Sequence, residues 1–281
     1  MKDIDSLVDK HYGFGSIMEK IEAGLTLAGK ELHSLTVDDL APIDEFHTRG
    51  RESTLELADL ANLGASDSVV DVGCGLGGTA RHLADQYRCN VSGLDLTAEY
   101  VEVGTKLTEL VGLGDFVKLR RGSALEIPFD DEVFDIAWTE HVQMNISDKH
   151  RFYSEIARVL KPGGRLLFHD IFRGSGDPPF YPAPWAEDES ISSLVTEATA
   201  RSAMEQAGLK IDQWIPKVIE SIEFFKAVST RIEQDGPPPI GIHLLMGDNA
   251  KEKLQNYVRN LSEERVCVAM GVARRESLPG G

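Results

Sequence analysis

Four glycines fall within six positions, directly after a short apolar run that contains one acid. The run is Val69–Val72 with Asp71 inside it, and the glycines occupy the segment Gly73–Gly78. A short run of β-branched apolar residues predicts a buried parallel strand. Glycine lets the backbone turn sharply and approach a ligand closely, because it has no Cβ. The amides that open the helix predicted from Thr79 would then face that ligand.

A second acid lies at the end of the next predicted strand. The strand Val91–Leu96 contains Asp95, which lies 24 residues after Asp71. In an α/β fold that binds a nucleoside, an acid at this position accepts hydrogen bonds from ribose hydroxyls. The alternative is that Asp95 caps the helix that begins near Thr97. Combined with the glycines, Asp95 predicts a nucleoside site.

A group of polar residues follows the predicted strand Phe134–Trp138. It includes Glu140, His141, Gln143 and Asn145. Ligands of open α/β sheets bind at the carboxyl ends of the strands, so we expect these side chains to face a ligand. His141 is the expected proton acceptor, because the ordinary pKa of histidine lies near neutrality. Gln143 and Asn145 would orient the substrate, whereas a purely structural His141 remains the alternative.

The spacing of the glycines separates two kinds of nucleotide site. The dinucleotide fingerprint is Gly-x-Gly-x-x-Gly, but here the order is Asp71-x-Gly73-x-Gly75-x-Gly77. This order resembles the first motif of class I S-adenosylmethionine (SAM) methyltransferases, and it disfavours a nicotinamide-dependent dehydrogenase. Three later segments resemble further motifs of that family in the same order: Arg120–Phe129, Phe134–Trp138 and Leu160–Leu166.

The resemblance implies a cofactor and the residues that bind it. The cofactor would be SAM, with S-adenosylhomocysteine (SAH) as its product. In similar small-molecule enzymes an N-terminal segment folds over the SAM site and often brings a tyrosine and an arginine. The residues that match cofactor-binding positions of the family are Tyr12, Arg49, Asp71, Gly73, Gly75, Asp95, Leu96, Ser123 and Ala124.

The resemblance also implies a class of reaction. The chain looks similar to sarcosine/dimethylglycine N-methyltransferases and to tocopherol and phosphoethanolamine methyltransferases. We therefore expect methyl transfer to a small molecule, first of all an amine such as glycine, sarcosine or dimethylglycine. An O- or C-methyltransferase of a phenolic, quinone or isoprenoid acceptor remains open, as does a non-catalytic SAM-binding regulatory module. Tyr181 and Trp185 would either wall the substrate pocket or pin their loop to the surface.

Composition limits the partners of this chain. Its 281 residues carry a formal net charge of −17, which disfavours both nucleic acid and an anionic membrane surface. The three cysteines are scattered, so we expect a reducing compartment and no metal site. The acidic opening residues and the lack of a long apolar run predict a cytoplasmic protein without membrane insertion. We expect a monomer or a homodimer.

The motifs require an α/β scaffold to position them. We predict a Rossmann-like, seven-stranded, mostly parallel sheet with helices on both faces. One methyltransferase domain would span residues 1–281, with an N-terminal helical cap at 1–64 and a SAM-binding core at 65–172. Residues 173–281 would supply a lid, helices on the substrate side and the final strands. Within that part, Ser190–Ala207 and Ile219–Gln234 are predicted helices, and Lys210–Val218 is a strand near an edge.

Overall fold

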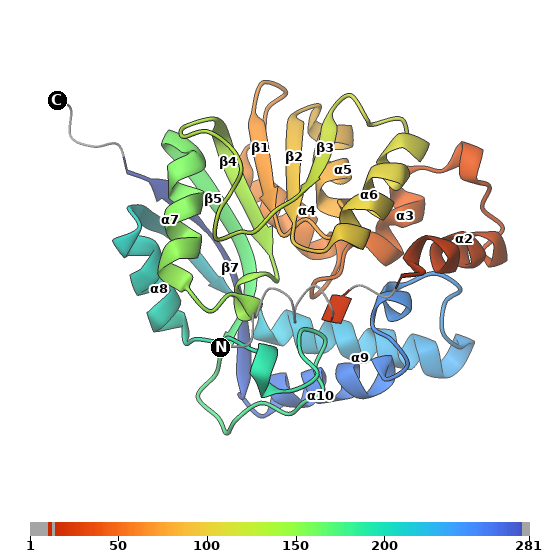
Figure 1. Ribbon diagram of the computed structural model, residues 1–281. Helices are drawn as coiled ribbons and strands as arrows, with labels where there is room; N and C mark the ends of the chain where they lie inside the picture. The colour runs from red at the N-terminus through yellow and green to blue at the C-terminus, as the bar shows by residue number, and fades with distance from the viewer. Residues whose placement is uncertain (1–10, 13–14, 277–281) are drawn as a thin grey trace.

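A twisted sheet of seven strands forms the centre of the computed structural model, which describes residues 11–12 and 15–276 (Figure 1). The strand order is β3-β2-β1-β4-β5-β7-β6. The first five strands are parallel, and β7 runs antiparallel to both β5 and β6. This confirms the predicted fold class. The strands are β1 Ser68–Val72, β2 Asn90–Asp95, β3 Val117–Arg121, β4 Phe134–Glu140, β5 Leu160–Arg173, β6 Leu209–Pro216 and β7 Val266–Arg275.

Helices cover both faces of the sheet. Helices α4 (Arg51–Ala61) and α5 (Gly78–Tyr87) pack on one face through a core that includes Leu57 and Leu83. On the other face lie α7 (Lys149–Val159) and α8 (Glu197–Gln206). Helix α6 (Ala98–Leu110) packs against α2 (Ile17–Leu27), and α3 (Val37–Asp44) joins the same apolar cluster.

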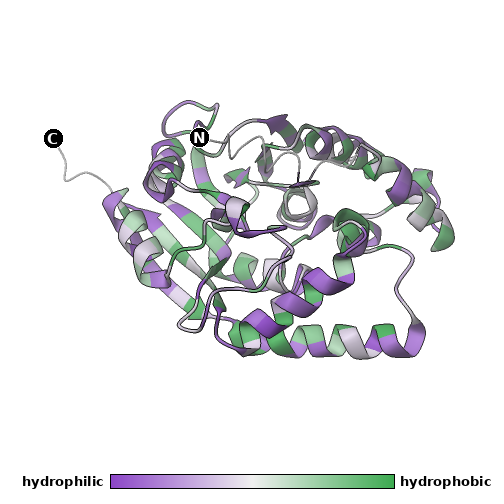
Figure 2. Ribbon diagram, turned by 60° about the horizontal axis from the view of Figure 1, so that its bottom comes forward, coloured by the Kyte–Doolittle hydropathy of each residue, from purple (hydrophilic) through white to green (hydrophobic). Residues whose placement is uncertain are grey.

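The carboxyl ends of the parallel strands are covered by a second group of helices. Helices α9 (Val218–Asp235) and α10 (Ala250–Ser262) lie together beyond the lower edge of the sheet (Figure 1). Figure 2 turns this cover toward the viewer and shows hydrophilic and hydrophobic residues mixed along it. Within α9, Phe225 is buried, whereas Ile232 is 37% exposed. No helix within the described ranges is both long and apolar enough to cross a membrane.

Two helix starts show how local side chains set the boundaries. Asp148 precedes α7, and its carboxylate accepts a hydrogen bond from the Arg151 amide at 2.8 Å. The prediction of a single helix over Ser190–Ala207 is wrong, because α8 begins only after Thr196. Thr196 forms a bridge with Arg173 of β5, and its hydroxyl caps the new helix. The chain is therefore extended just before Thr196, and the hydroxyl supplies the helix start.

Candidate active site

The glycine segment turns directly from β1 into α5. Gly73, Gly75 and Gly77 have φ values of 78°, 54° and 79°, a region that side chains disfavour. A Cβ on Gly73 would lie 2.3 Å from Cγ2 of Val142, so this glycine permits close packing against the segment after β4. A Cβ on Gly75 would meet no atom within 4 Å. Gly75 therefore leaves open space above the loop.

Asp95 holds the glycine segment from the neighbouring strand. Its Oδ2 accepts a hydrogen bond from the Gly75 amide at 2.8 Å, and its Oδ1 accepts from the Thr97 amide at the same distance. The acid thus holds Thr97, the residue that precedes α6, and also lines the space above the glycines. It therefore does not cap the helix itself.

A cavity opens at the carboxyl ends of β1, β2 and β4, where the strand order reverses direction. Parallel sheets bind their ligands at this switch point. With its open mouth, and with the open solvent there included, the cavity encloses about 1420 Å³ of empty space. The predicted site residues that line it are Tyr12, Asp71, Gly73, Gly75, Asp95, Leu96, Ser123, Ala124, His141, Asn145 and Trp185.

The charged groups of the cavity wall are acidic. Asp44, Asp71, Asp95 and Glu140 line it, whereas no lysine or arginine of the described residues does. Burial raises the pKa of Asp71 well above its usual range, and the nearby Glu140 and Asp95 raise it further. Within the described chain, Oδ2 of Asp71 is buried without a hydrogen-bond partner. A ligand that donates hydrogen bonds or carries positive charge would satisfy this oxygen.

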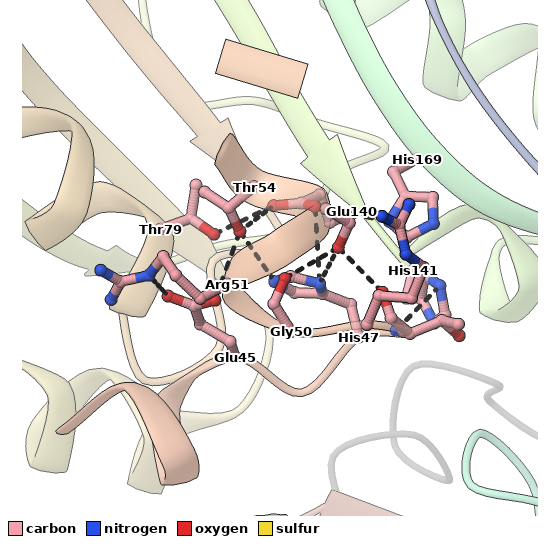
Figure 3. Close-up of polar contacts among 12 residues, drawn as sticks. Glu45, His47, Gly50, Arg51, Thr54, Thr79, Glu140, His141 and His169 are labelled. Carbon is pink, nitrogen blue, oxygen red and sulfur yellow. Dashed lines mark hydrogen bonds and ion pairs between the residues drawn. The ribbon is translucent and has the colours of Figure 1, made fainter. Parts of the chain in front are cut away.

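Three histidines surround the end of β4. The ring of His141 is partly exposed to the cavity, and its centroid lies 5.0 Å from that of His169 and 6.2 Å from that of His47 (Figure 3). Burial, and then the neighbouring His169 and His47, hold the pKa of His141 well below its usual value. The pKa of His141 therefore lies below the ordinary histidine value from which its role as proton acceptor was predicted. The ring is neutral at physiological pH, and the lone pair on its Nε2 accepts a hydrogen bond from the Thr48 amide at 3.4 Å.

Comparison with known proteins identifies the core. Residues 70–168 match a family described as a methyltransferase domain. A probable tocopherol O-methyltransferase of Oryza sativa subsp. japonica is 44% identical over 36% of this chain and 28% of its own length. The sarcosine/dimethylglycine N-methyltransferase of Halorhodospira halochloris is 28% identical over 65% of each chain. Residues 70–168 form a methyltransferase domain.

A solved structure extends the similarity of this methyltransferase domain to the surrounding helices. The phosphoethanolamine N-methyltransferase 2 of Haemonchus contortus, solved in complex with SAM, matches 99% of this chain and 61% of its own length. The TM-score is 0.76 at 18% identity, which shows a shared fold. The chain covers less than two thirds of the length of the curated relatives named above. The resemblance to SAM-dependent methyltransferases that the sequence motifs indicated is confirmed.

Three predicted site residues lie outside the cavity of the methyltransferase domain. The Arg49 guanidinium donates to Glu56 Oε2 at 2.8 Å, so it is engaged by a protein carboxylate away from the cavity lining. Gln143 is fully buried and its amide donates to the Ile171 carbonyl. Tyr181 packs edge-on against Trp185 with ring centroids 6.4 Å apart. All three side chains therefore contact other protein residues and not the cavity.

Asn145 connects three separate segments. Its Nδ2 donates to the carbonyls of Trp185 and Ile191, both at 2.9 Å, and its Oδ1 accepts from the Tyr12 hydroxyl at 3.2 Å. The amide is therefore occupied by protein partners, and it fixes the lid and the N-terminal segment beside the cavity. We assign Asn145 a positioning role, in place of the substrate contact that the sequence suggested.

Sequence reasoning missed His47 and His169, and it gave Glu140 no specific role. Glu140 is the last residue of β4, and His169 lies opposite it on β5. Parallel strands end at one edge of the sheet, so the positions of both residues in their strands could have placed them at the site. His47 comes from the segment between α3 and α4, and nothing in the sequence pattern places it beside Glu140.

Proposed function

We propose that this chain transfers a methyl group from SAM to the hydroxyl of an uncharged, largely apolar small molecule. One observation carries the choice of acceptor: the cavity wall beyond the glycine segment is apolar and aromatic, and no described lysine or arginine lines it. This wall includes Phe46, Met144, Trp185, Phe225, Met246 and Leu254.

The acidic wall on the other side suits the cofactor. SAM carries a sulfonium and an ammonium group, and the orphaned oxygen of Asp71 offers an acceptor for such a donor. Leu96, Ser123 and Ala124 line the part of the cavity where the family motifs would place adenine. When bound, SAM supplies the methyl group and leaves as SAH, and the acceptor gives up its proton to a base. His141 is the base that we assign.

The same lining argues against charged acceptors. The carboxylate of glycine or sarcosine, like the phosphate of phosphoethanolamine, is normally bound by arginine or lysine. Leaving such an anion beside Asp71, Asp95 and Glu140 would add repulsion to the cost of burial. Among the acceptors considered from the sequence, the cavity therefore favours the phenolic, quinone or isoprenoid class over glycine-like amines.

A screen for methyl transfer tests the proposed acceptor. We expect labelled methyl from SAM to reach apolar phenols, hydroquinones or prenyl alcohols, and not glycine, sarcosine or phosphoethanolamine. Mass spectrometry of the products would give the methylated atom. Transfer to glycine-like amines alone would overturn the acceptor class. Tight SAM binding without turnover on any acceptor would favour the non-catalytic module.

Replacing Asp95 tests the cofactor site itself. We expect Asp95→Ala to weaken SAM binding by about 1–3 kcal/mol, because both the ribose and the Gly75 amide lose a hydrogen-bond acceptor. Isothermal titration calorimetry with SAM and SAH measures this effect. The control Asp115→Ala removes an exposed acid outside the cavity and should bind SAM like the wild type. Unchanged affinity in a folded Asp95→Ala variant would contradict the assignment.

A further inference from the structure

Three side chains from separate segments converge beside the cavity. They are His47, Glu140 at the end of β4, and His169 on β5 (Figure 3). Each contributes one ligand atom, and these atoms lie within 4.8 Å of one another. Nδ1 of His47 and Nδ1 of His169 are each 3.5 Å from Oε1 of Glu140.

These separations suit a small metal ion. With bonds of about 2.0–2.2 Å to nitrogen and oxygen, ligand atoms around a tetrahedral zinc ion lie roughly 3.4 Å apart. Both contacts of the Glu140 oxygen already have nearly this length. The two histidine nitrogens are at most 4.8 Å apart, so small side-chain rotations would complete the geometry.

The hydrogen bonds of the cluster leave Glu140 and His169 partly unsatisfied, whereas Nδ1 of His47 lies 3.1 Å from Ser53 Oγ, a contact that metal binding would replace. Oε2 of Glu140 accepts from Thr79 Oγ1 at 3.0 Å and from Trp138 Nε1 at 2.9 Å. By contrast, Oε1 of Glu140 and both ring nitrogens of His169 are buried without a hydrogen-bond partner in the described chain. Leaving each such group unpaired costs about 1–3 kcal/mol, so a buried cluster of them points to a bound group.

We propose that His47, Glu140 and His169 bind one divalent transition-metal ion. Two imidazoles and a carboxylate are a ligand set typical of zinc and of other late first-row metals. The proposal departs from the expectation of no metal that we drew from the scattered cysteines. Metal binding itself does not depend on the acceptor proposed above.

The position of the cluster suggests what the ion would do. His47 and Glu140 line the cavity, and His141 does so beside them. Three protein ligands with one open position are the arrangement of catalytic rather than structural zinc sites. The open position would face the acceptor, and coordination would lower the pKa of its hydroxyl. The proton of that hydroxyl would pass to His141. This role rests on the proposed function, although the metal site does not.

Metal titration of the untagged, chelator-treated protein tests the site. We expect one Co²⁺ per chain with visible ligand-field absorption, displaced by one Zn²⁺. His169→Ala and His47→Gln should bind Co²⁺ more than about 100-fold more weakly, and Thr79→Val about 10–100-fold more weakly, because Thr79 orients the carboxylate. His47→Gln changes a segment between helices and serves where His169→Ala does not fold.

The matched control is His150→Gln, which removes an exposed histidine of α7. It should bind Co²⁺ like the wild type. The proposal is overturned if the wild type binds no stoichiometric metal, or if folded ligand variants bind it unchanged. SAM affinity and methyl transfer are measured separately, so a failure of the metal site is distinguished from a failure of the proposed function.

Discussion

Replacement of His141 is expected to lower turnover by about 10²–10⁴, the usual contribution of a positioned general base. Its ring lines the cavity next to the apolar wall, and its partners there are Thr48 and His169 rather than the glycine segment. SAM affinity should therefore change little while kcat falls. Steady-state kinetics on the acceptor identified in the screen, together with calorimetry for SAM, would measure both quantities.

The choice of substitution at His141 matters because its backbone φ is 54°. Asparagine tolerates this left-handed region better than alanine does, so His141→Asn should accompany His141→Ala. His150→Ala, on the exposed face of α7, is the control for loss of a histidine far from the cavity. If His141→Asn turned over at the wild-type rate, the ring would have only a structural role, through its contacts with Thr48 and His169.

The sequence alone was sufficient to predict those parts of the site that lie within one short segment. The apolar run before Gly73 and the acid at Asp95 each belong to a strand end, and parallel strands bring such ends to one edge. Local pattern and topology together therefore located the glycine segment, the acid and His141 at one cavity.

Contacts between distant segments could not be predicted in the same way. Arg49 matched a family position, but the nearby Glu56 engages its guanidinium, and sequence spacing does not reveal that competition. His47 reaches Glu140 across 93 positions of the chain, because α3 ends beside α5. Whether a polar side chain faces a ligand or a protein partner depends on such packing.

A buried ion pair fixes the N-terminal cap to the core. Nη2 of Arg81, on α5, donates to Oδ2 of Asp44 at 2.7 Å, and both side chains are completely buried. Nη1 of Arg81 also donates to the Gly104 carbonyl at 3.1 Å and to the Thr108 hydroxyl at 2.9 Å. Burial raises the pKa of Asp44, although the Arg81 charge opposes this rise. The Arg81 guanidinium therefore favours the ionised form of the Asp44 carboxyl.

Loss of Arg81 is accordingly expected to destabilise the fold strongly. Arg81→Met should lower the free energy of unfolding by about 3–5 kcal/mol, because it leaves the Asp44 carboxyl buried without its partner. Urea denaturation measures this loss. The double variant Asp44→Leu/Arg81→Met should recover much of it, since no uncompensated charge remains. Lys106→Met breaks the exposed pair with Glu102 and should leave stability nearly unchanged. A small effect for Arg81→Met would mean that water or rearrangement compensates Asp44, and that the pair does not anchor the cap.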